Sequence, residues 1–539
     1  MTPQEKPLPH PPSGFVSLVL HCHLPFVRHP EHEYFLEENW YYEGVFETYL
    51  PLLEVFESLE NKKIPFSLTL SVSPTLLSMC LDPLLQKRAL RYVDQLLALL
   101  KREKKRVGQD DSFGPVVQMY EEKLSRYRDL FMKYHGNVAE GFKRFQDSGH
   151  LELITCAATH GFLPLLRVYE PAVRAQIETA LQLHRDFFGK NPVGFWLPEC
   201  AYEPGMDKIL KEYGIQFTFL ETHGVLQATP HPSFGTFAPI VCPSGVTVFG
   251  RDLESSKQVW SAKEGYPGDP VYREFYRDIG YDLTTEELHP YLQPENFRRF
   301  TGLKYYRITG GTDQKEPYNP QLAQAKVRVH AGDFLSRRRH QAEEAHRWMD
   351  RPPLMTCLYD AELFGHWWYE GPSFLQELFE QNAGRQESLR FITPSDYLKI
   401  FSENQITQPV FSTWGVGGYS EFWLNETNDW IYPPLNSACA EMIRLADLKH
   451  TSGKLVLRAL NQAARELLLA QSSDWAFMMK AGRYAPYAEQ RIKIHLNRFY
   501  QLADSIRTNR VSEAYLSDLE ERDNLFRKMD YQTFKKDPR

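Results

Sequence analysis

The chain has 539 residues, of which 42% are hydrophobic and 24% charged, and its formal net charge is -7 at pH 7. This length predicts two to four structural units, and the mild acidity argues against a general nucleic-acid-binding protein. No run approaches the roughly 18 uninterrupted apolar residues that a membrane span needs, so no membrane partner is expected. The Pro-rich segment 1–14 lacks an apolar signal core and is expected to be disordered. Seven cysteines without paired spacing predict a reducing cytoplasm.

Short apolar runs recur along the chain, and each ends in polar or ionisable residues. They cover residues 15–20, 66–70, 151–155, 195–197, 217–220, 246–249 and 354–359. Helical patterns lie between several of them, and strands that alternate with helices indicate an α/β fold with a parallel sheet. Ionisable residues at the carboxyl ends of such strands are typical of a barrel with one active face. We therefore predict a barrel or near-barrel.

Two parts of the chain break this alternation. From about residue 81 to 147 the pattern is helical and highly charged, which predicts a helical insertion whose basic cluster 101–106 is a solvated helix end. From about residue 433 apolar residues recur at helical spacing, which predicts a C-terminal helical domain. The expected division is therefore a catalytic barrel in 15–80 and 148–410, an insertion in 81–147, and a helical domain in 411–539 that contributes to the cleft.

Two carboxylates stand at predicted strand ends among aromatic residues. Glu199 follows the run Phe195-Trp-Leu197 and Pro198, and Asp360 follows residues 354–359 and precedes an aromatic segment. A carboxylate among apolar neighbours is costly because desolvation disfavours its charged form. Two of them, each at a strand end, indicate an acid and a nucleophile that act on a sugar.

A metal-dependent hydrolase is the competing hypothesis. His21 and His23 follow the first strand, and residues two apart in an extended chain share a face. Together with His160, His223 and Asp360 they could form a metal site. Against this, the segments around the carboxylates are more aromatic than a metal site requires, and no lysine offers a bridging ligand. A purely structural role for the two early histidines also stays open.

Several later residues are candidates for sugar contacts. The Gly-rich stretch 411–425 carries Trp414 and Trp423 but lacks the Lys-Ser/Thr that a nucleotide loop needs. Aromatic faces near flexible backbone favour a sugar platform, although core packing is an equal alternative for each tryptophan. Arg251 and Trp260 follow another apolar run and could line the same face. Asp474 lies beside a tryptophan in an apolar helix, where an acid usually needs a partner.

These segments together resemble glycoside hydrolase family 57, and most closely its 1,4-α-glucan branching enzymes. The resemblance rests on five ordered stretches, which are His21-Cys-His-Leu-Pro-Phe26, His160-Gly-Phe-Leu-Pro164, Trp196-Leu-Pro-Glu-Cys-Ala-Tyr202, Tyr359-Asp-Ala-Glu-Leu-Phe-Gly-His-Trp367 and Trp414 to Asn425. It implies an incomplete seven-strand (β/α) barrel with a helical insertion and a C-terminal helical domain. By the same resemblance the substrate is an α-1,4-glucan, and neither a metal nor another cofactor takes part.

The resemblance also implies roles for individual residues. Glu199 matches the family's nucleophile and Asp360 its general acid/base. The residues that match the lining of the substrate cleft are His21, His23, His160, Trp260, Trp414, Trp423 and Asp474. A retaining pair of carboxyl groups stands roughly 5 to 5.5 Å apart. The acceptor chain is expected against Trp414 and Trp423.

One segment departs from the family pattern. Branching members carry a long mobile loop with a functional tyrosine in the region that corresponds to residues 224–239, whereas this stretch is short and lacks tyrosine. A shorter lid leaves the intermediate open to water, which predicts weaker transfer or a largely hydrolytic enzyme. An α-amylase or 4-α-glucanotransferase on the same scaffold is therefore the alternative to a branching enzyme.

Overall fold

The computed structural model describes residues 12–108, 110, 112–261, 264–288, 291, 298–384, 389–448 and 453–536. The segment 1–14 that we expected to be disordered lies outside this description except for its last three residues. Among the described residues, no helix combines the length and apolar character needed to cross a membrane.

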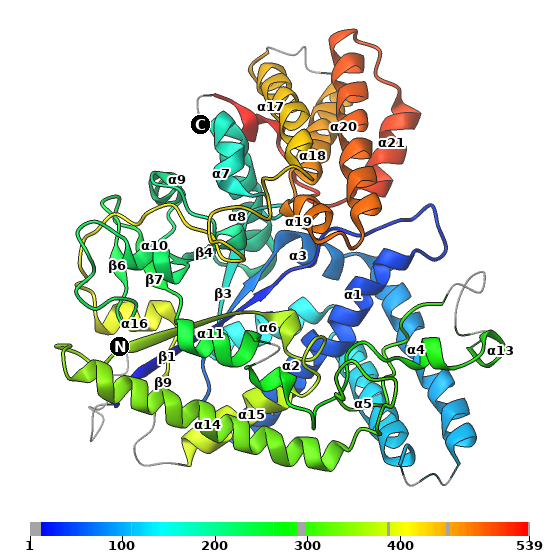
Figure 1. Cartoon of the computed structure of the whole chain (residues 1–539). Coiled ribbons are helices and arrows are strands. Elements are labelled where there is room, and N and C mark those ends of the chain that lie inside the picture. The colour runs from blue at the N-terminus through cyan, green and yellow to red at the C-terminus, as the bar shows by residue number, and fades with distance from the viewer. Residues whose placement is uncertain are drawn as a thin grey trace.

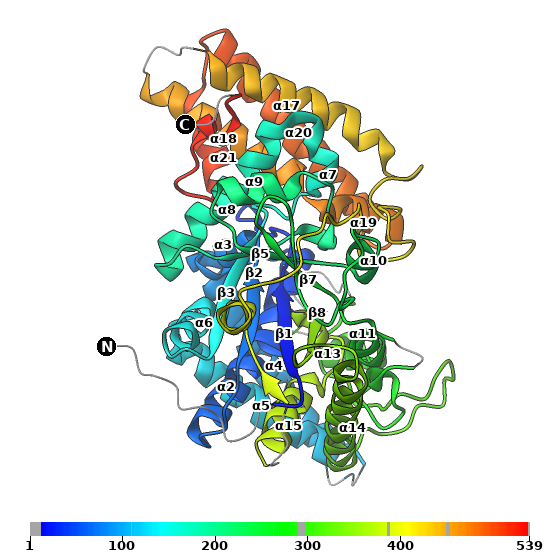
Figure 2. The ribbon, with the colours of Figure 1, turned by 90° about the vertical axis from the view of Figure 1, so that its left-hand side faces the viewer.

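Seven parallel strands form the curled sheet at the centre of the described chain (Figures 1 and 2). In sheet order they are β7 (Thr247–Gly250), β5 (Phe217–Leu220), β4 (Gly194–Trp196), β3 (Leu151–Cys156), β2 (Leu68–Val72), β1 (Phe15–Cys22) and β8 (Leu354–Asp360). The two-residue strand β6 (Ile240–Val241) runs antiparallel to β7, and β9 (Arg390–Phe391) pairs with the start of β1. Every residue of β1 and β2 is buried, as expected for a parallel sheet covered on both faces.

The barrel is not fully closed. The outer strands β7 and β8 are joined through an isolated bridge between Arg251 and Thr356, and the Asp252 amide donates to the Thr356 carbonyl at 2.8 Å. The other neighbouring strands pair over two to seven residues. The predicted incomplete seven-strand barrel is confirmed.

Four helices connect β2 to β3, namely α3 (Pro74–Cys80), α4 (Pro83–Val107), α5 (Gly114–Lys133) and α6 (Val138–Asp147). Asp82 caps α4 by accepting a hydrogen bond from the Leu85 amide, and Pro83 occupies the first turn, where its missing N–H costs nothing. The basic cluster 101–106 is the last part of α4. Its Lys104 pairs with Glu121 at the surface, so the cluster is the solvated helix end that we predicted.

A second long excursion separates β7 from β8. It contains α11 (Leu253–Trp260), α12 (Ile279–Asp282), α13 (Thr285–Leu288) and the 27-residue helix α14 (Pro320–His346). This segment packs on the first insertion, where the Tyr120 hydroxyl of α5 donates to the Lys304 carbonyl at 3.1 Å. Between β1 and β2 lie α1 (Asn39–Glu43), the π-helical segment η2 (Gly44–Tyr49) and α2 (Leu50–Asn61).

The remaining barrel helices are α7 (Leu163–Leu166), α8 (Glu170–Phe188), α9 (Met206–Glu212), α10 (Thr222–Leu226), α15 (Gly371–Ala383) and α16 (Pro394–Ile400). The C-terminal helices are α17 (Tyr432–Asp447), α18 (Lys454–Ala470), α19 (Ser473–Ala481), α20 (Ala485–Arg507) and α21 (Glu513–Arg522). Both ribbon views place α17–α21, in orange and red, at one end of the molecule and α14 and α15 at the other (Figures 1 and 2). Helix α19 bears Ser473 and Asp474, which reach the carboxyl ends of the strands.

Candidate active site

A cleft of about 900 Å³ opens at the carboxyl ends of the strands. Its walls come from the barrel, from the excursion between β7 and β8, and from the chain between 414 and 484. It gathers the ten residues that the sequence predicted as catalytic or sugar-binding, namely His21, His23, His160, Glu199, Arg251, Trp260, Asp360, Trp414, Trp423 and Asp474. These residues are up to 453 positions apart along the chain (474 − 21), so the fold is what brings them together.

Glu199 leaves β4 in an unusual backbone conformation. Its φ of 61° lies in the left-handed region, which costs about 1 kcal/mol or more for a residue with a Cβ. Two donors fix the carboxylate in this position: Trp414 Nε1 donates to Oε2 at 2.7 Å, and Ser473 Oγ donates to Oε1 at 3.1 Å. The Trp414 amide also donates to the Glu199 carbonyl at 3.0 Å. The side chain is thus held in one orientation from two directions.

The surroundings of Glu199 act on its pKa in both directions. Burial raises the pKa to about 7, and the hydrogen bond from Trp414 opposes this rise. The nearby Asp360 and Asp474 carboxylates contribute to this raised value, whereas His23 lowers the pKa. The negative charge of Asp360 is thus one of the influences that favour the protonated form of Glu199.

Asp360 ends β8, paired with His21 in the register of β1 and β8. Its pKa is raised to about 7, chiefly by burial and also by the Glu362 carboxylate, while His23 and Arg251 oppose the rise. Within the described part of the chain, no side chain donates a hydrogen bond to the Asp360 carboxyl group. The ionised form of Asp360 therefore has less support from donors than that of Glu199.

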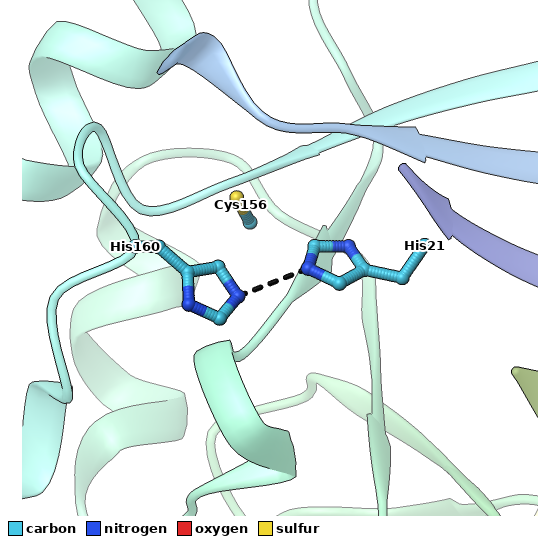
Figure 3. Close-up of side chains that lie close together, drawn as sticks. All are labelled: His21, Cys156 and His160. Carbon is cyan, nitrogen blue, oxygen red and sulfur yellow. Dashed lines mark hydrogen bonds between the residues drawn. The ribbon is translucent and has the colours of Figure 1, made fainter. Parts of the chain in front are cut away.

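A chain of hydrogen bonds runs beneath the cleft to Glu199. Ser71 Oγ contacts His21 Nδ1 at 3.1 Å, His21 Nε2 lies 2.9 Å from His160 Nε2, and His160 Nδ1 lies 2.9 Å from Ser473 Oγ. Figure 3 shows the two imidazoles joined in this way, with Cys156 beside them. Burial lowers the pKa of both histidines well below the usual value, so both rings are neutral at pH 7.

His23 is paired with a carboxylate next to these neutral rings. Its Nε2 lies 3.1 Å and 3.2 Å from the two carboxylate oxygens of Asp474. Burial alone would lower the pKa of His23, but Asp474 outweighs this effect and raises it, while His23 lowers the pKa of Asp474. His23 is thus the partner that we expected Asp474 to need in its apolar helix. The His23 ring stacks on the His160 ring with the centroids 3.8 Å apart.

The aromatic residues fall into two groups. Trp414 donates a hydrogen bond to Glu199. Trp423 is only 2% exposed and stacks on Phe162 with ring centroids 5.1 Å apart. Trp260, in contrast, is 39% exposed at the end of α11. Arg251 lies over the Trp414 ring, 5.4 Å from its centroid, and is itself oriented by Glu221 at 2.8 Å.

Comparison with known proteins identifies the family of this site. The family model for glycosyl hydrolase family 57 matches residues 17–410, which is most of the chain. The chain belongs to glycosyl hydrolase family 57. A second model, for the C-terminal part of 1,4-alpha-glucan branching enzymes, matches residues 434–534.

Relatives within family 57 resemble the chain over nearly its whole length. A 1,4-alpha-glucan branching enzyme of Thermococcus kodakarensis is 33% identical and aligns with 95% of this chain and 77% of its own. A probable 1,4-alpha-glucan branching enzyme of Mycobacterium tuberculosis is 30% identical over 93% of this chain and 94% of its own. The crystal structure of an alpha-amylase from Thermotoga maritima matches with a TM-score of 0.92 and 40% identity, covering 98% of this chain and all of the other.

Residues 225–239, the short segment where a long loop was expected for a branching enzyme, are hydrogen-bonded to residues outside the cleft. Residues 225–239 are all described, and none of them lines the cleft. Thr229 and Gln408 exchange two backbone hydrogen bonds of 3.0 Å, and the Ser233 amide donates to the Gln405 side chain at 2.7 Å. The Leu354 amide, at the start of β8, donates to the Phe237 carbonyl at 2.8 Å. This segment does not act as a lid in the described structure.

The ligand set of the alternative metal site is not assembled. His223 Nε2 lies 3.0 Å from the Gly418 carbonyl, on the glycine-rich loop. In the described residues, the potential ligand clusters that include the early histidines are His21 with Cys156 and His160, and His23 with His160 and Asp474. Neither His223 nor Asp360 belongs to these clusters or to the remaining one. The five residues considered as metal ligands are therefore not gathered into one cluster of potential ligands in the described residues.

Sequence reasoning missed two residues that shape the family 57 site. Glu362 accepts hydrogen bonds from the Tyr49 hydroxyl and from the His23 amide, and it lies close enough to Asp360 to raise its pKa. Ser473 joins His160 to Glu199. Each is within two positions of a residue that was identified, but neighbours in sequence carry no signal of a contact to a distant carboxylate.

Proposed function

We propose that this protein is a retaining 1,4-α-glucan branching enzyme, in which Glu199 is the nucleophile and Asp360 the general acid/base. The observation that carries the proposal is the pair of half-buried carboxyl groups that follow β4 and end β8, facing one cleft in opposite hydrogen-bonding environments. Membership of family 57 and the match of residues 434–534 to the branching-enzyme C-terminal model support it. Two relatives with at least 30% identity are named branching enzymes.

The environments of the two groups support the assignment of roles. Glu199 receives hydrogen bonds from Trp414 and Ser473, and these donors stabilise its carboxylate form. Asp360 stands next to the Glu362 carboxylate, which favours its protonated form. Two carboxyl groups whose surroundings push them towards different protonation states are what an acid and a nucleophile require.

The reaction then runs in two steps. Asp360 donates its proton to the glycosidic oxygen while the Glu199 carboxylate attacks the anomeric carbon, the glycosidic bond breaks, and a glycosyl ester forms. Asp360, now ionised, takes the proton of an acceptor hydroxyl as that oxygen attacks the same carbon and expels Glu199. A glucan 6-hydroxyl as acceptor makes an α-1,6 branch, and water makes a hydrolysis product. Arg251 and the hydrogen-bonded pair of His23 and Asp474 bind and orient the sugar at this centre.

An α-amylase on the same scaffold, or a 4-α-glucanotransferase, is the second candidate. It is favoured by the 40% identity to the alpha-amylase structure of Thermotoga maritima. The position of residues 225–239, which contribute nothing to the lining of the cleft, also leaves the intermediate more exposed to water.

Linkage analysis separates these candidates. Purified protein is incubated with amylose, and the anomeric protons of the products are followed by NMR, with the Glu199→Gln variant as the inactive control. New α-1,6 signals are expected for a branching enzyme. New reducing ends alone indicate an amylase, and redistributed linear chains indicate a 4-α-glucanotransferase.

We also propose the division of the chain and its cellular setting. A catalytic barrel in 15–80 and 148–410, an insertion in 81–147 and a helical domain in 411–539 agree with the positions of the two family models. All seven cysteines are free and buried, which suits a reducing cytoplasm.

A further inference from the structure

We propose that the acceptor glucan binds on an acceptor shelf made by Phe275, Trp367, Glu47 and His366, rather than on Trp414 and Trp423. The inference rests on the proposed transfer reaction and names the surface that selects its acceptor. All four residues line the same cleft as Glu199 and Asp360.

The two tryptophans expected to hold the acceptor are both less exposed than Trp367. The indole of Trp414 is held by its hydrogen bond to Glu199, and Trp423 has 2% of its surface exposed. Trp367, in contrast, is 46% exposed within the cleft. Phe275 covers part of it, with the ring centroids 4.4 Å apart and the planes inclined by 25°. A broad, supported aromatic surface of this kind matches the C–H face of a pyranose.

Polar groups border this aromatic surface within the same cleft. His366, the neighbour of Trp367, places Nδ1 2.7 Å from Oε2 of Glu47. Burial alone would raise the pKa of Glu47, but His366 and Lys304 outweigh it and lower the pKa, so the carboxylate stays ionised and accepts hydrogen bonds. Lys304 Nζ lies 3.9 Å from the centroid of the Phe275 ring and also lines the cleft. The shelf thus offers an acceptor and a donor beside an aromatic face, the usual combination for sugar recognition.

The backbone of η2 and of the turn at Gly365 holds the residues of the shelf together. Glu47 belongs to the π-helical segment η2, a rare conformation that is frequent at functional sites. Gly365 has φ +117°, and a Cβ there would stand 1.8 Å from the Glu47 carbonyl oxygen. The turn that carries His366 and Trp367 therefore lies directly against η2, which fixes the shelf to the segment that begins at Asp360.

The shelf belongs to the segment that begins at Asp360, and this places it on the acceptor side of the cleft. The general acid/base meets the leaving group and then the incoming hydroxyl, whereas the nucleophile lies under the donor sugar. Glu199 is held by Trp414 and Ser473 from the C-terminal side of the chain, and the shelf extends from Asp360 through Glu362 to Trp367. The surface continuous with the acid/base is the one that an acceptor meets.

The test measures how the glycosyl-enzyme intermediate divides between transfer to the acceptor and hydrolysis. With para-nitrophenyl α-maltoheptaoside as donor and maltohexaose as added acceptor, nitrophenol release reports formation of the intermediate, and chromatography separates transfer products from hydrolysis products. For Trp367→Ala we expect the acceptor concentration for half-maximal transfer to rise about tenfold, and the ratio of transfer to hydrolysis to fall by a similar factor. Glu47→Gln, which keeps the size of the side chain, is expected to change the ratio in the same direction.

The matched control is Trp348→Ala, because Trp348 is 51% exposed and does not line the cleft. Its partition ratio is expected to equal that of the unmodified enzyme. If Trp367→Ala and Glu47→Gln both keep the normal ratio, or lose transfer and hydrolysis in parallel, the acceptor shelf is wrong. If the unmodified enzyme releases nitrophenol but forms no transfer product at any acceptor concentration, the proposed transferase function fails instead.

Discussion

The indole of Trp414 donates a hydrogen bond to Oε2 of Glu199 at 2.7 Å, although 215 residues separate the two along the chain. This bond opposes the effect of burial on the pKa of Glu199, and it ties the start of the C-terminal part of the chain to the barrel.

Replacing Trp414 by phenylalanine removes this donor while keeping an aromatic ring. The pKa of Glu199 should then rise, by about one unit if the bond contributes about 1.4 kcal/mol. Because the reaction needs ionised Glu199, the acidic limb of the kcat/KM profile is expected to move to higher pH. A profile with its acidic limb unchanged would contradict a direct role of this hydrogen bond.

The alkaline limb of the pH profile of kcat/KM should depend on Glu362. Glu362 is a carboxylate that raises the pKa of Asp360, and its own pKa is raised to about 7, mainly by burial. Glu362→Gln removes the negative charge, so the pKa of Asp360 falls and less of it is protonated above neutral pH. We expect the alkaline limb of kcat/KM to move down by about one unit. Movement in the opposite direction would exclude this electrostatic coupling.

Ser473 provides a separate test of how Glu199 is positioned. Ser473→Ala removes a hydrogen bond to the carboxylate and breaks the link to His160, which should lower kcat about tenfold to a hundredfold. Ser473→Thr keeps a hydroxyl and should restore part of the rate, measured under saturating amylose. Ser437→Ala is the control, because the Ser437 hydroxyl bonds within its own helix. Equal activity of Ser473→Ala and Ser437→Ala would rule out the positioning role.

The two catalytic assignments predict different chemical rescue. Glu199→Gln and Asp360→Asn should each lower activity by more than about a thousandfold while the circular dichroism spectrum stays unchanged. Added azide should restore turnover of an activated donor in both variants. The glycosyl azide should be of inverted configuration for Glu199→Gln and of retained configuration for Asp360→Asn, because azide replaces a different group in each. NMR of the products distinguishes the two, and swapped configurations would reverse the roles.

Gly365 should be intolerant of any side chain. Its positive φ and the 1.8 Å approach of a Cβ to the Glu47 carbonyl predict that Gly365→Ala lowers the free energy of unfolding by about 3 kcal/mol or more. Gly384→Ala is the control, since its φ is negative and the nearest atoms to a Cβ lie 3.8 Å away. Thermal denaturation of the two variants measures the difference. Similar melting temperatures would mean that the turn can relax.

The strand ends were the part of this molecule most open to prediction. Fully buried parallel strands appear in the sequence as continuous apolar runs. The run 217–220 coincides with β5, and the run 66–70 starts two residues before β2 and overlaps it. Because carboxyl ends of parallel strands share one edge, finding Glu199 and Asp360 at such ends also predicted their common cleft. Their catalytic roles stay predictions until the variants above are measured.

The contacts of irregular segments could not be predicted in this way. Trp414 and Trp423 occupy the same glycine-rich stretch, yet one donates to Glu199 and the other is packed on Phe162. No periodicity exists in such a loop to indicate which face of each ring is buried. The contact of Ser473 with Glu199 spans 274 positions and depends on how α19 is placed over the barrel, which local sequence does not encode.

The single bridge between Arg251 and Thr356 makes the sheet a split ring, and this has a mechanical consequence. Asp360 stands on the strand at the split, whereas Glu199 lies just after β4, which is in the middle of the sheet. The firm connection between them is the longer route through β3, β2 and β1, each joined to the next by a parallel ladder. The spacing of the two carboxyl groups is therefore set by strands that carry neither of them, and core substitutions in β2 or β3 should alter the rate by widening or narrowing that spacing.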